Sequence, residues 1–177
     1  VFGRLLGPDA GHWRIAPTTL LLGVYGLFGF HFLLFVALRT APPLEANLVN
    51  YLWPLLIVVL APVILPGLRL TALHVVAALA GFAGAALAIV GGRSLGGELS
   101  WGYLAAAGSA IVWATYSLGT QRVARFPTAA IGLFGLVSGA LALACHALLE
   151  PKVALSTRDW VLIALIGVGP LGAAFFF

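Results

Sequence analysis

Six apolar segments, separated by short breaks that are rich in turn residues, dominate this sequence. Each is about 20 residues long, and an α-helix of that length spans about 30 Å, the thickness of a bilayer's hydrocarbon core. We therefore expect an all-α membrane protein, a bundle of transmembrane helices. The predicted helices cover residues 17–38, 43–65, 71–91, 100–120, 128–149 and 159–177.

Composition supports lipid as the solvent for most of this chain. Apolar residues make up 62% of it and charged residues 8%, against about 45–50% and about 25% in ordinary soluble domains. A water-soluble globule of 177 residues could not bury so much apolar surface. The net charge of +4 comes from scattered arginines and not from a basic run, so no nucleic-acid site is expected.

An internal repeat predicts the larger architecture. The run from Leu21 to Phe32 is echoed by the run from Leu165 to Phe176, at a constant offset of 144 residues that holds five helices. A unit with an odd number of spans enters the membrane in the opposite sense the second time, as in many transporters. We expect two inverted repeats and about ten helices in all. Residues 1–92 would end the first repeat and residues 93–177 would begin the second, with helices missing at both ends.

The second segment begins with polar residues that share one side. Asn47, Asn50, Tyr51 and Pro54 lie within about 100° of one another on a helix, and Trp53 lies beside Asn50. Because proline removes a backbone donor and frees a carbonyl, a broken helix with amides and aromatics on one side is able to line a cavity. The alternative is a simple kink, with the asparagines hydrogen-bonded between helices.

His31 lies deep in the first segment, between Phe28 and Phe35 at helical spacing. Histidine changes charge near neutral pH, and polar side chains inside spans usually face a bundle interior or a cavity. His31 is therefore a candidate proton carrier or substrate ligand. The alternative is a neutral histidine that is hydrogen-bonded to a neighbouring helix.

The fourth segment carries a polar and aromatic stripe. Its members are Ser109, Trp113, Tyr116, Ser117 and Thr120, which lie within about 100° on a helix. We take Trp113, Tyr116 and Ser117 as candidate substrate-binding residues, because aromatic faces suit an apolar, aromatic or ammonium-bearing ligand. The alternative is an interfacial aromatic belt.

Small residues recur at four-residue spacing in two other segments. Ala77, Gly81 and Ala85 form a row in the third segment, and Gly135 and Gly139 form a GxxxG in the fifth. In lipid such rows let helix backbones approach closely. They predict helix packing and not chemistry.

Enzyme and cofactor motifs are missing from the sequence. It has no HExxH, CxxC, Walker loop or GxSxG, and its single cysteine matches no metal spacing. We expect no cofactor, no metal and no catalysis. Two other classes stay open: an intramembrane enzyme, which would need clustered carboxylates or a nucleophile and base, and a membrane interaction protein without a transport path.

The run from Leu38 through Glu45 and Asn47 to Pro54 resembles the drug/metabolite transporter superfamily with paired EamA domains. Its last five residues, from Asn50 to Pro54, are similar to those of the YddG-type aromatic amino-acid exporters. The resemblance implies a ten-helix carrier that exports small metabolites by alternating access, with aromatic or other neutral amino acids or drugs as substrates. The family's cavity lies between the repeats. It would map here onto His31, Asn50, Trp53, Trp113 and Tyr116.

The expected location is the inner membrane of a bacterium, with multiple spans. The excess of arginine over lysine and the abundance of alanine indicate a GC-rich source. A small-molecule substrate and membrane lipid are the expected partners, and the oligomeric state is left open.

Overall fold

The computed structural model describes residues 15–90, 100–124, 126–127, 129–151 and 154–169, and all regular structure in these ranges is helical. The chain divides into two compact units, residues 16–124 and the remainder. The first unit contains α1 (Pro17–Val24), the π-helical turn η3 (Tyr25–Gly29), α2 (Phe30–Thr40), α3 (Pro43–Asn50), α4 (Trp53–Ile64), α5 (Ala72–Val90) and α6 (Gly102–Gly119). The second contains α7 (Ala129–Leu149) and α8 (Thr157–Val168).

The prediction of membrane-length apolar helices is confirmed. Among the described residues, three helical stretches are long and apolar enough to cross a bilayer: Pro17–Thr40, Pro43–Ile64 and Ala130–Leu149. The other predicted segments are also helical, as α5, α6 and α8. The predicted sixth helix begins two residues early, at Thr157, and its residues 170–177 lie outside the described residues, as does the last part of the second repeat run.

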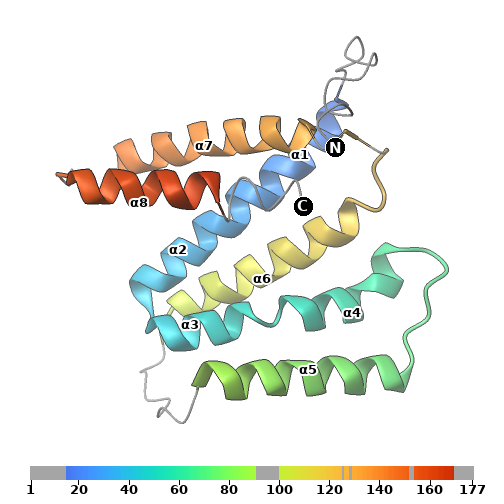
Figure 1. Ribbon diagram of the computed structural model, residues 1–177. Helices are drawn as coiled ribbons and strands as arrows, with labels where there is room; N and C mark the ends of the chain where they lie inside the picture. Colours follow the sequence, from blue (N-terminus) through green and yellow to red (C-terminus); the bar gives the residue numbers. More distant parts are fainter. Residues whose placement is uncertain (1–14, 91–99, 125, 128, 152–153, 170–177) are drawn as a thin grey trace. The chain divides into compact units, whose positions relative to one another are not determined.

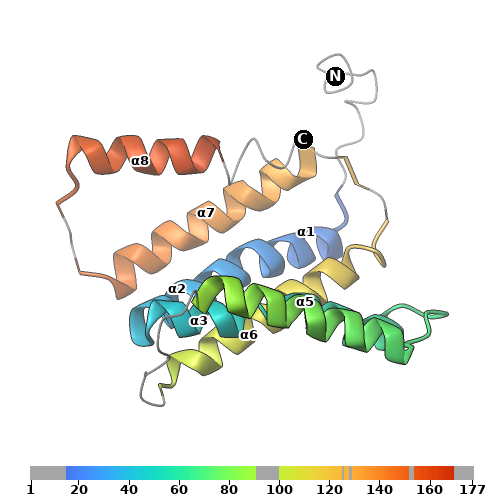
Figure 2. The ribbon, with the colours of Figure 1, turned by 60° about the horizontal axis from the view of Figure 1, so that its bottom comes forward.

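The first unit is a layer of rods with α6 inside it. Helix α6 packs against α2 on one side and against α3 and α4 on the other, and α5 lies along α4 (Figure 1). In the turned view α5 lies in front of α3 and α6 (Figure 2). The fourth predicted span therefore lies between the first and the second and packs against both.

Small side chains let these helices approach closely. Ala37 and Ala46 form a buried cluster with Ala105 and Ala106 near the start of α6. At Gly102 an added Cβ would lie 2.6 Å from Thr40 Oγ1 and 2.8 Å from Ala41 Cβ. Without a hydrophobic drive between helices in lipid, such close contact supplies the packing energy.

Local chemistry explains where these helices begin. Helix α3 follows the extended residue Ala41 and begins at Pro43, where a missing N–H costs nothing. Helix α8 begins with a capping box in which the side chains and backbone amides of Ser156 and Asp159 bond reciprocally. The turn at Gly67 has φ of 91°, a conformation that glycine adopts without strain.

Two spans are irregular at their centres. The second is interrupted at Tyr51 and Leu52, and Pro54 stands in the first turn of α4, as the expectation of a proline-broken helix required. The first contains η3, which the sequence analysis did not predict. Both irregularities lie beside α6. The π turn contacts Thr115 and Tyr116, and Asn50, which ends α3, is hydrogen-bonded to Ser109.

Within the described residues, the glycines of the rows predicted for packing leave room for a side chain, although Gly81 and Ala85 line a groove that faces the second span. A Cβ added at Gly81, Gly135 or Gly139 would meet nothing within 4 Å. In the second unit, the buried side chain of Phe134 instead packs against the ring of Phe126.

Candidate aromatic substrate site

Trp113 is the centre of a cluster of aromatic rings from three spans. Its ring centroid lies 4.9 Å from that of Phe30 on α2, 6.4 Å from that of Trp53 on α4 and 5.6 Å from that of Tyr116 on α6. Rings in favourable contact have centroids 4.5–7 Å apart. All three distances fall in that range, so the indole of Trp113 contacts aromatic rings of both the first and the second span.

His31 joins the cluster through Phe30. Its ring stands edge-on to the Phe30 ring, with centroids 5.1 Å apart and planes at 86°. Its Nδ1 lies 2.7 Å from the carbonyl oxygen of Leu27. Because a carbonyl only accepts, Nδ1 must carry the proton, which leaves Nε2 as the acceptor of the neutral ring.

Trp53 owes its position to the interruption of the second span. Helix α3 ends at Asn50 and α4 begins at Trp53, so the indole stands at the start of a new helix, near the middle of the stretch Pro43–Ile64. The proline that follows it suits a first helical turn. A continuous helix would place the indole at a different angle.

The side chains of both asparagines form hydrogen bonds with helix residues. Asn50 is 5% exposed and accepts a hydrogen bond of 2.7 Å from Ser109 Oγ, which ties α3 to α6. Asn47 donates from Nδ2 to the carbonyl of Pro43 in its own helix, at 2.9 Å. The Asn50 bond is of the interhelical kind that the sequence left open as an alternative, whereas the Asn47 bond stays within α3.

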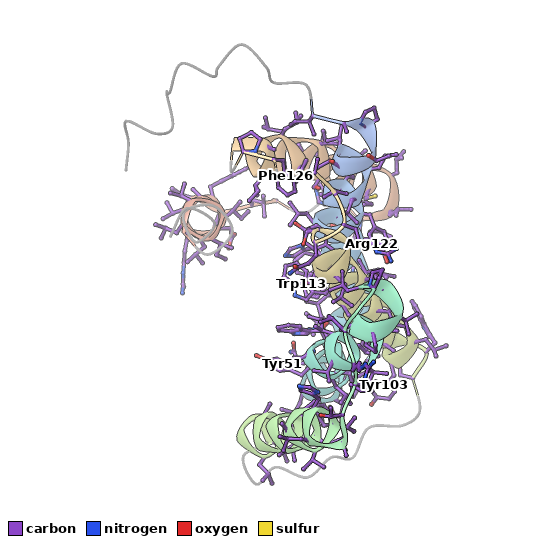
Figure 3. The ribbon with its side chains drawn as sticks, turned by 90° about the vertical axis from the view of Figure 1, so that its right-hand side faces the viewer. Tyr51, Tyr103, Trp113, Arg122 and Phe126 are labelled. Carbon is purple, nitrogen blue, oxygen red and sulfur yellow. The ribbon has the colours of Figure 1, made fainter. Side chains whose placement is uncertain are left out.

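Tyr51 and Pro54 lie beside a separate groove between the second span and α5. This groove has a volume of about 300 Å³ and is mostly apolar. It is lined by Tyr51, Pro54, Val58, Ala78, Gly81, Phe82 and Ala85. Figure 3 shows Tyr51 and Trp113 on one side of the helix layer and Arg122 on the other.

Ser117 does not join the cluster. Its hydroxyl donates to the carbonyl of Trp113 at 2.7 Å, which satisfies the side chain within α6. The structure thus brings together His31, Trp53, Trp113 and Tyr116 from the predicted set. It places Asn47, Asn50, Tyr51, Pro54 and Ser117 in other surroundings.

A family model decides what kind of protein this is. The model of the EamA-like transporter family matches residues 2–90. The chain belongs to the EamA-like transporter family. It is a membrane protein, as its apolar helices require.

Two relatives of this EamA-like chain agree with that assignment. The aromatic amino acid exporter YddG of Ancylobacter novellus is 46% identical to it over 157 residues, which make up 87% of this chain and 54% of the relative. A solved crystal structure, 44% identical in sequence, matches it with a TM-score of 0.80 and covers 92% of this chain and 57% of its own. The chain thus spans about half the length of the curated relative.

Sequence reasoning missed several residues of this EamA-like site. Phe30 touches Trp113, although only Phe28 and Phe35 were singled out around His31. Three more residues lie where the first span meets α6. Tyr25 is hydrogen-bonded to Thr115, and Gly26 lies against the ring of Tyr116. The glycines at positions 26 and 29 were the one visible signal, because paired glycines permit an irregular turn.

Proposed function

We propose that the full protein is a secondary transporter that exports aromatic or other neutral amino acids by alternating access. The observation that carries this proposal is the ring cluster around Trp113, which meets His31 through Phe30. It lies in a layer of apolar spans. The name of the Ancylobacter novellus relative supports the same substrate class.

The cluster has the chemistry to hold an amphipathic zwitterion. An aromatic side chain packed on one of these rings gains about 0.5–1.5 kcal/mol beyond area burial, and an ammonium over a desolvated indole gains about 2 kcal/mol. The neutral His31 offers Nε2 as an acceptor for an ammonium, and the protonated ring offers it as a donor to a carboxylate. The cluster therefore supplies a partner for each part of an aromatic amino acid.

The energetics favour a facilitator unless a proton moves as well. A membrane potential of 100 mV does work of about 2.3 kcal/mol per elementary charge. A zwitterionic amino acid carries no net charge and gains nothing from it. In the proposed cycle His31 is the candidate proton carrier, and without it export would run down a cytoplasmic excess of substrate.

The proposed architecture keeps two inverted repeats, with residues 1–92 in the first, residues 93–177 in the second and the cavity between the repeats. The family model supports a boundary there, because its match ends at residue 90. Helix α6 belongs to the second proposed repeat yet packs with helices of the first, as expected of intertwined halves. We propose that the protein lies in the bacterial inner membrane and that it is not an enzyme.

Flux through proteoliposomes tests this function. The full-length protein is reconstituted, and transport of labelled phenylalanine, tyrosine and tryptophan is compared with that of alanine and of a cationic drug, with and without a pH gradient. We expect saturable flux of the aromatic amino acids. Preference for the drug would favour a drug exporter of the same superfamily, and absence of all flux would contradict transport.

Site variants test which residues bind the substrate. Trp53→Ala and His31→Ala should raise the half-saturation concentration about tenfold, the equivalent of about 1.4 kcal/mol. Trp101→Ala is the matched control, because that indole is 61% exposed at the start of α6. Equal kinetics in all three variants and the wild type would overturn the site.

A further inference from the structure

The first span contains a turn whose geometry differs from the helix on both sides of it. Residues Tyr25–Gly29 form a π-helical turn, whereas α1 and α2 are α-helical. A π turn closes over one residue more than an α turn. It therefore offsets α2 from α1 by about 100° around the axis, since one residue of an α-helix turns by that angle.

Two adjacent residues of α6 hold this turn. The hydroxyl of Tyr25 lies 2.8 Å from Thr115 Oγ1. Thr115 already donates to the carbonyl of Ile111 at 2.7 Å, so its one proton is used and Tyr25 is the donor. One residue further along each helix, Gly26 lies against the ring of Tyr116, so closely that an added Cβ would be 2.3 Å from the ring carbons.

The turn is also linked to the aromatic cluster by a closed circuit of contacts. The carbonyl of Leu27, within the turn, accepts from His31. His31 meets Phe30, Phe30 meets Trp113, and Trp113 meets Tyr116. The ring of Tyr116 then returns to Gly26 in the same turn.

We propose that the π turn Tyr25–Gly29, held by Thr115 and Tyr116, is a positioning element that sets the orientation of Phe30 and His31 toward Trp113. Tyr25, Gly26 and Thr115 are then positioning residues for substrate binding at the cluster. If the turn relaxed to an α-helix, α2 would rotate by about 100° relative to α1 and these two rings would leave the Trp113 face. This inference rests on the proposed function and adds to it residues that need not touch the substrate.

Mild variants test the proposal in the full-length protein. Tyr25→Phe and Thr115→Val each remove the hydrogen bond between the two hydroxyls and keep the shape of the side chain, and Thr115→Val also removes the bond to the carbonyl of Ile111 within α6. Each should raise the half-saturation concentration for labelled phenylalanine about three- to tenfold, at an unchanged maximal rate. Because Tyr25→Phe loses only the shared bond, the double variant should show no larger effect than Thr115→Val alone.

Tyr103→Phe is the matched control, because the hydroxyl of Tyr103 has no hydrogen bond within the described residues and the side chain lies on the other side of the layer from Trp113 (Figure 3). It should leave both kinetic constants unchanged. Gly26→Ala should have the largest effect, because the Tyr116 ring must move to admit the methyl group. The hydroxyl variants decide the matter if Gly26→Ala does not fold.

Three outcomes would overturn the proposal while leaving the proposed function intact: unchanged half-saturation in Tyr25→Phe and Thr115→Val, additive effects in the double variant, or a fall in maximal rate alone. No flux in the wild type would overturn both. The two failures are distinguishable because only the second removes transport from the unmodified protein.

Discussion

Glycine has opposite surroundings at the α6 interfaces and on α5. At Gly26, and at Gly102 on α6 itself, an added Cβ would collide with a neighbouring helix, whereas at Gly81 and Gly84 on α5 it would meet nothing within 4 Å. In the sequence Gly81 and Gly102 alike have alanines at the four-residue spacing that is typical of membrane helices. The difference teaches that a small residue indicates close packing only when a partner helix lies opposite it.

The largest effect on stability should come from the centre of the packed region. Trp113→Ala removes a ring that contacts three others and should lower the free energy of unfolding by about 3–5 kcal/mol. Denaturant titration of the full-length protein in detergent measures this. Trp101→Ala, at an exposed indole, should cost less than about 0.5 kcal/mol, and equal losses would break the distinction between the two sites.

The next effect should come from adding a single methyl group to the packed interface. Gly102→Ala should cost about 1–3 kcal/mol, because its Cβ would lie within 3.0 Å of the backbone nitrogen of Ala41, which cannot move aside as a side chain does. Thermal unfolding compares it with Gly84→Ala. A melting temperature equal to that of the wild type would show that the α2–α3 corner is looser than this contact implies.

A moderate effect should follow from the buried hydrogen bond between α3 and α6. Asn50→Ala and Ser109→Ala should each cost about 0.6–1.7 kcal/mol, from the average to the largest value measured for such bonds between membrane helices. The double variant should cost less than the two single variants added together. Asn47→Ala is the control, because its bond stays within one helix. If the losses in the two single variants add up to the loss in the double variant, Asn50 and Ser109 are not energetically coupled.

The smallest effect should come from the open face of α5. Gly84→Ala, and Gly81→Ala in the wide groove shared with the second span, should leave stability unchanged or raise it by about 0.5–1 kcal/mol, because alanine favours a helix and the added methyl group meets nothing within 4 Å. The same unfolding measurements apply. A clear loss in the full-length protein would show that another helix covers this face, and would restore the packing role that the sequence predicted for it.

Much of the candidate site was predictable because its residues are unusual for their surroundings. His31, Trp53, Trp113 and Tyr116 stand out in apolar spans, and all four lie in or beside one cluster. Phe30 did not stand out, since phenylalanine is an ordinary residue in such a span. Its contact with Trp113 depends on the phase of α2 after the π turn, which no local pattern specifies.

The sequence by itself determined where the helices lie, because apolar length, prolines and glycines act within a few residues of one another. It therefore predicted the break at Pro42 and Pro43 and the interruption beside Pro54. Only the tertiary structure decided that Asn50 bonds to Ser109, 59 residues away, and that Tyr25 bonds to Thr115, 90 residues away. Such contacts depend on which helices are neighbours and on how each is rotated about its axis, and both are settled by the packing of the whole layer.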